Sequence, residues 1–176
     1  MKTITIILLL SSLLFSGLAQ SATSIKFDNE EYPNKFTNNS PTIKLAEYVR
    51  KNETFKKWTK LIAVRNYTNL NNPKEAAVNL AKIVKQHNPK ANYQIIQSKE
   101  GESVQIDFLT WPKTLEYLEF NIHRYMKVEG YTGLISYQFA YRFKISSPKS
   151  VELFKKNKNH WVSEMVKANF EIKFKK

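Results

Sequence analysis

The three histidines, His87, His123 and His160, are the side chains best suited to acid–base chemistry or metal binding. No two of them have the spacing of paired metal ligands on one helix turn or strand face, and no HExxH pattern occurs. The chain has no cysteine, which excludes thiol catalysis and cysteine-ligated zinc. We therefore predict no metal site and no cofactor, and we expect each histidine to be structural or to lie on the surface.

A hydrolytic site built on His123 is the enzymatic alternative. Asp107 or Glu119 would supply a carboxylate, and Ser103 or Ser136 would supply a nucleophile. The chain lacks the G-x-S-x-G pattern that presents a nucleophilic serine on a tight turn, and it has only four glycines. The residues favour a non-enzymatic role, with a small secreted hydrolase as the alternative, and we assign no catalytic residue.

Clusters of lysine point to a different chemistry, the binding of anions. The 28 basic residues exceed the 15 acidic ones and give a formal charge of +13. All but four of the basic residues are lysine, a hydrated point charge, whereas arginine provides the fork used for specific phosphate or base recognition. We therefore expect no nucleic-acid partner and predict an anionic membrane surface or an acidic protein. The candidate contact residues are Lys56, Lys57, Lys60, Lys155, Lys156, Lys158, Arg124 and Arg142.

Aromatic residues alternate along the segment 134–145 and predict the core face of a strand. If the opposite face of the sheet is uncovered, it becomes a binding surface or a face for dimerisation. The residues expected on that face are Tyr117, His123, Tyr125 and Arg142.

Residues 1–21 resemble a secretory signal peptide. Lys2 precedes an apolar run over residues 4–14, and small residues follow that suit cleavage after Ala19 or Ser21. The apolar run is shorter than the roughly 20 residues that span a membrane. We expect an exported protein, periplasmic or secreted, with no transmembrane segment in the mature chain.

The remaining chain has the length of one domain. Residues 22–55 are polar and are expected to be irregular with short strands, continuous with an α+β domain over residues 56–176. Alternation over 58–68 predicts a strand that places Trp58 on the same face as Ile62 and Val64. Asn72-Pro73 is a strong helix start, and Asn88-Pro89 ends that helix.

Further strands are predicted at 93–98 and 103–108, followed by a long antiparallel hairpin over 115–145. Ser147-Pro148 then repeats the helix-start signal, and apolar residues at helical spacing predict a helix over 148–169. Together these elements predict the α+β class, with an antiparallel β-sheet flanked by two main helices.

This layout resembles the PsbP-like α/β/α sandwich over residues 56–170. The matching features are the W-T-K-L-I-A-V strand, the N-P-K-E helix start, the hairpin 115–145 and the final amphipathic helix. The chain also resembles small exported proteins of Gram-negative bacteria. The resemblance implies a binding or assembly factor rather than an enzyme, and it transfers no site residue.

Overall fold

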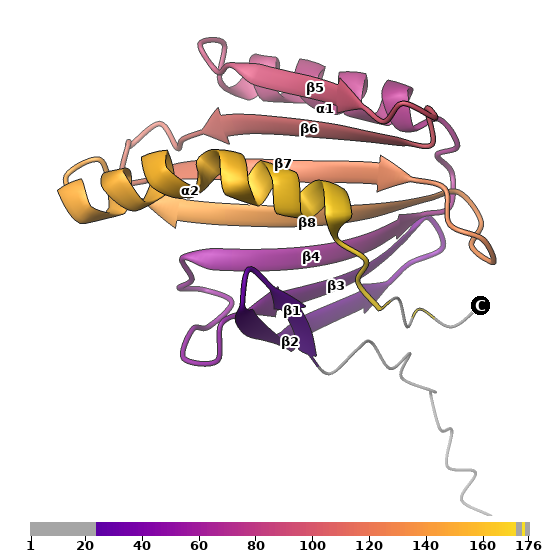
Figure 1. Ribbon diagram of the computed structural model, residues 1–176, viewed down its shortest axis with the longest axis horizontal. Coiled ribbons are helices and arrows are strands. Elements are labelled where there is room, and N and C mark those ends of the chain that lie inside the picture. Colours follow the sequence, from indigo (N-terminus) through magenta and orange to yellow (C-terminus); the bar gives the residue numbers. More distant parts are fainter. Residues whose placement is uncertain (1–23, 172–173, 175–176) are drawn as a thin grey trace, which may run out of the picture.

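The strands form one antiparallel sheet in the order β1-β2-β3-β4-β8-β7-β6-β5 (Figure 1). The computed structural model describes residues 24–171 and residue 174. The strands are β1 Ser24–Phe27, β2 Glu30–Asn39, β3 Ile43–Val49, β4 Lys60–Tyr67, β5 Tyr93–Gln97, β6 Ser103–Thr110, β7 Leu118–Met126 and β8 Leu134–Phe143. The helices are α1 Pro73–His87 and α2 Pro148–Lys167.

The main core lies between α2 and one face of the sheet. Alternate residues of β8, among them Tyr137 and Phe139, point to this face and are buried, as the sequence predicted. From α2, Trp161 and Met165 complete the core, and the Trp161 ring lies 5.1 Å from that of Phe139. The predicted hairpin is confirmed as β7 and β8, with Leu118 paired to Phe143 at its open end.

Helix α1 packs on the opposite face, behind β5 and β6 in Figure 1. The Asn72 side chain caps it by accepting hydrogen bonds from the backbone N–H groups of Lys74 and Glu75. The helix buries small residues, which bring its backbone close to the sheet: Ala76, Ala77, Ala81 and Val84. The predicted α+β class is confirmed, with one helix on each face of an antiparallel sheet.

The N-terminal segment is more regular than the sequence predicted. Residues 22–55 contain three strands of the sheet, and β2 alone runs for 10 residues. Of the β2 residues only Tyr32 is fully buried, so the sequence of this mostly polar strand shows little alternation of polar and apolar residues. The predicted signal peptide lies outside the described residues. No helix in the described part of the chain is long and apolar enough to span a membrane.

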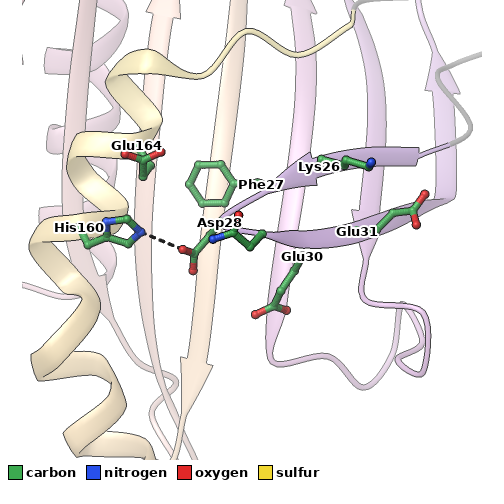
Figure 2. A pocket seen from close by; sticks show the side chains of 8 residues that line it. Lys26, Phe27, Asp28, Glu30, Glu31, His160 and Glu164 are labelled. Atoms are coloured by element: carbon green, nitrogen blue, oxygen red, sulfur yellow. Dashed lines mark hydrogen bonds and ion pairs between the residues drawn. The ribbon is translucent and has the colours of Figure 1, made fainter.

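Asp28 fastens the β1–β2 hairpin to α2. Its carboxylate accepts a hydrogen bond from Trp161 Nε1 at 2.7 Å. It also lies 2.8 Å from His160 Nε2, as Figure 2 shows. The buried ammonium of Lys60 lies 3.7 Å from the same carboxylate and also bonds Glu30. One carboxylate therefore joins the hairpin, the helix and the centre of the sheet.

Asp28→Asn should lower the free energy of unfolding by about 1–3 kcal/mol, because it removes a charge that compensates buried Lys60. Asparagine tolerates the left-handed backbone of this position, φ 51°, so the variant tests the charge rather than the turn. Urea denaturation measures the change.

The matched control is Glu164→Gln, which removes the exposed pair formed by Glu164 and Lys167 on the same helix. An exposed pair of this kind contributes less than about 1 kcal/mol. Equal losses in the two variants would show that Asp28 has no special role in joining the hairpin to α2.

Candidate anion-binding site

A pocket of about 390 Å³ opens at the end of the sheet where β4 begins and β8 ends. Its walls come from three connections: the β3–β4 loop, the residue before β7, and the segment from β8 into α2. The lining residues are Lys56, Lys57, Trp58, Thr59, Tyr117, Arg142, Phe143, Lys144, Ser147 and Ser150. The pocket thus combines basic and aromatic side chains from segments far apart in the sequence.

Arg142 is held rigidly in the wall of this pocket. Its guanidinium carbon lies 3.9 Å from the centre of the Trp58 ring and 4.1 Å from that of Tyr117. Two rings at this distance fit on opposite faces of the planar group. Glu119 Oε2 accepts hydrogen bonds from Arg142 Nε at 3.2 Å and Nη2 at 2.8 Å. The carboxylate neutralises the guanidinium, so Arg142 mainly shapes the pocket.

A row of polar side chains, which we call the polar ladder, continues from Glu119 across the sheet. Asn121 Nδ2 donates to Glu119 at 3.1 Å, and Gln138 Nε2 donates to Asn121 at 2.8 Å. Arg65 then donates to Gln138 at 2.6 Å and to Glu47 at 3.5 Å. Burial raises the pKa of Glu47, and the charge of Arg65 opposes that shift. The ladder holds Glu119, and with it Arg142, in place.

The turn that presents Lys56 and Lys57 is fixed by Glu53. The carboxylate accepts hydrogen bonds from Arg50 Nη2 at 2.6 Å and Thr59 Oγ1 at 2.5 Å. Burial alone would raise the pKa of Glu53, but these hydrogen bonds outweigh it and lower the pKa. The turn is thus held at its ends, and its exposed residues Lys56 and Lys57 line the pocket.

The positive charge of the pocket comes from its lysines and from a helix end. None of the ion pairs among the described residues involves Lys56, Lys57 or Lys144. Helix α2 begins beside them, capped by Ser147, and its first turn holds no acidic residue. The N-terminus of a helix carries partial positive charge. An anionic group in this pocket would therefore meet positive charge from two sources.

Two of the predicted contact residues, Lys60 and Arg124, lie elsewhere, and this corrects the sequence interpretation. Lys60 is only 5% exposed and points toward α2, because it is two residues from Ile62 on the same strand face. Arg124 Nη1 donates to the carbonyl of Ala168 at 3.0 Å and so caps the end of α2. Burial lowers its pKa. The alternation of side chains along β4 and β7 could have predicted that both residues face α2.

Lys155, Lys156 and Lys158 form a second cluster on α2, apart from the pocket. Lys155 and Lys156 are exposed, whereas Lys158 lies 3.9 Å from Asp107 and 5.6 Å from the centre of the Phe120 ring. The eight predicted residues therefore divide into a pocket group of Lys56, Lys57 and Arg142, a helix group and two structural residues.

Sequence reasoning missed Lys144 and placed Trp58 wrongly. Trp58 precedes β4 and packs with Leu61 and Ala63 on the face opposite to Ile62. Tyr117 and Arg142, both expected on the open sheet face, are in contact in the pocket wall. Their expected neighbours on that face, His123 and Tyr125, are buried instead. The binding surface is thus smaller than a whole uncovered sheet face.

The hydrolytic alternative does not fit the geometry around His123. The ring stacks between Phe108, 5.7 Å away, and Tyr125, 6.2 Å away. Asp107 pairs with Ile122 and therefore points to the opposite face of the sheet. Glu119 shares the face of His123 but is bound to Arg142 and Asn121. The buried Nδ1 of His123 has no hydrogen-bond partner in the described part of the chain, so no carboxylate orients the ring from that atom.

A hollow of about 440 Å³ beside the β1–β2 turn is acidic rather than basic (Figure 2). Glu30, Glu31 and Glu164 line it, together with Asp28, whose carboxylate is bound to α2. Over the described residues, no group of three potential ligands is placed to hold a metal ion. This hollow belongs to the hairpin attachment described above.

A family model matches residues 19–170, most of the chain. The chain belongs to this uncharacterised protein family. No curated protein matches it. Among solved structures, it is similar to a point mutant of the protein Mog1, with 14% identity and a TM-score of 0.47 over 78% of this chain and 82% of that one.

Burial lowers the pKa of His123 from 6.5 to about 3, with a smaller contribution from Arg65. Between these values the unfolded chain binds a proton that the folded chain does not, so stability falls as the pH drops below about 6.5. His123→Phe removes this proton uptake. The free energy of unfolding should then fall less steeply with decreasing pH, by up to about 1.4 kcal/mol per pH unit.

Urea denaturation of both proteins at several pH values between about 4.5 and 7 measures the two slopes. Identical slopes would mean that His123 titrates normally in the folded protein and is not sealed between the two rings.

Proposed function

We propose that the protein is an exported, non-catalytic binding protein that holds an anionic group of its partner in the pocket of Lys56, Lys57 and Lys144. The observation that carries the proposal is the convergence on one pocket of a helix N-terminus and three lysines that take part in no ion pair of the described residues, beside aromatic walls. Export rests on the signal-like residues 1–21.

The shape of the pocket supports a ligand with both an anionic and an apolar part. The rings of Trp58 and Tyr117 provide flat apolar walls, and three exposed lysines line the same pocket. A volume of about 390 Å³ suits a small group rather than a folded segment. Lysines on flexible stems neutralise charge without fixing geometry, which favours broad recognition of phosphate or carboxylate.

Phenyl phosphate is a suitable probe because it joins a dianion to an aromatic ring. We expect it to shift the NMR signals of the Trp58 indole and the Lys144 amide. The double variant Lys56→Ala/Lys57→Ala should weaken binding by about tenfold, since it removes two charges near the phosphate. Added salt should weaken binding to the original protein as well.

The matched control is Lys155→Ala/Lys156→Ala, which removes the same charge from exposed positions of α2. It should leave phenyl phosphate binding unchanged within about twofold. Equal weakening by both double variants would indicate that the overall positive charge of the protein, and not the pocket, attracts phenyl phosphate. That result would contradict the proposal. Absence of any binding at low salt would contradict the proposal outright.

A further inference from the structure

Three loops meet at the end of the sheet that carries the pocket. They cover residues 50–59, 111–117 and 144–147, and we call them together the loop end. The strand register places them side by side, because Lys60 pairs with Tyr141 and Leu118 with Phe143 (Figure 1). The loop end therefore forms one continuous tip of the molecule, beside the N-terminus of α2.

The loop end exposes large apolar side chains. Ile145 is 59% exposed and Leu115 is 56% exposed, the highest values among the large apolar residues of the described chain. A third, Phe55, is 45% exposed and stacks on Phe36. Single exposed apolar residues are ordinary, but the two most exposed ones project from neighbouring loops around one pocket.

The backbone at Leu115 is unusual for leucine. Its φ is +54°, in the left-handed region, and its N–H closes a turn by donating to the carbonyl of Pro112 at 2.9 Å. Glycine or asparagine adopts this conformation at lower cost. A leucine at such a position gives the turn a large apolar side chain, which the turn itself does not require.

Basic residues outnumber acidic ones in the same three loops. The three loops contain six basic residues and two acidic ones, and the acidic Glu53 is bound to Arg50. Glu116 is the other acidic residue. The basic residues that take part in none of the ion pairs of the described chain are Lys51, Lys56, Lys57, Lys113 and Lys144.

We infer that the loop end docks on the surface of an anionic lipid bilayer. Leu115 and Ile145 enter the interface, and the surrounding lysines bind the headgroups, one of which occupies the pocket. This inference rests on the proposed function and names its partner. Lysines near an anionic membrane each strengthen binding by about fivefold, so several together hold a protein reversibly.

The arrangement of the tips favours a bilayer over an acidic protein. A protein partner would require a continuous complementary surface, whereas the apolar tips here stand on separate loops, each within two residues of a lysine. The acyl region of a bilayer accepts isolated apolar side chains at any spacing. Trp58 and Tyr117 belong to the same loops and line the pocket, and such rings are common at the level of lipid headgroups.

Sedimentation with vesicles tests the inference. The protein should bind vesicles of equal parts phosphatidylcholine and phosphatidylglycerol, and should not bind pure phosphatidylcholine. Leu115→Ser/Ile145→Ser should weaken binding by about tenfold or more, because it removes both inserted side chains. The matched control Ile83→Ser/Val166→Ser removes two exposed apolar side chains from the helices and should bind as the original does.

Insertion can be observed directly because the chain has no cysteine. A single cysteine at Leu115→Cys, labelled with an environment-sensitive fluorophore, should show a blue-shifted emission when anionic vesicles are added. The same label at Ile83→Cys should not respond. Circular dichroism of each variant establishes that the fold is retained.

The outcomes separate the inference from the proposed function. Binding of phenyl phosphate without binding of anionic vesicles would overturn the bilayer inference and leave the anion pocket standing, with an acidic protein or a soluble anion as its partner. The inference would also be overturned if Leu115→Ser/Ile145→Ser left vesicle binding unchanged, or if Lys155→Ala/Lys156→Ala abolished it. Failure of both probes would remove the proposed function itself.

Discussion

The alternation of side chains along β8 organises both faces of the sheet. This strand lies near the middle of the sheet between β4 and β7, so both of its faces are buried. One set of residues, represented by Phe139, packs under α2, and the other set, represented by Gln138, faces the opposite side. Arg142 belongs to the second set and reaches the pocket because the strand ends one residue later. The core and the candidate site thus come from a single pattern.

The face opposite α2 is only partly covered by α1, and the remainder is closed by side chains. A small apolar cluster of Val49, Leu61, Ala63 and Ala140 fills one part. The polar ladder fills another, and its hydrogen bonds satisfy groups that are buried without a helix above them. Buried polar networks with satisfied members rigidify their surroundings. The pocket wall is rigid for this reason, although it lies at the edge of the domain.

Sequence reasoning succeeded where a local pattern determines the structure. Alternation in β8 and the caps at Asn72 and Ser147 predicted the hairpin and both helices. It failed for β2, whose polar residues pair because neighbouring strands are present, not because of their own pattern. For the site, charge located Lys56 and Lys57, but Lys144 emerged only when the register brought the end of β8 beside the β3–β4 loop. Long-range pairing of this kind leaves no signal in one sequence.

The contrast between Arg142 and the lysines determines what the pocket can recognise. Glu119 and two rings hold the guanidinium. Its Nε and Nη2 donors already bond the carboxylate, so this pair cannot bind a phosphate in a bidentate manner. Lys56, Lys57 and Lys144 are exposed and take part in none of the ion pairs of the described residues, and a lysine side chain of this kind is flexible and strongly hydrated. A site with a fixed apolar wall and movable charges discriminates poorly between anions, but it adapts to many of them. Those properties suit reversible attachment to a charged surface better than selection of one metabolite.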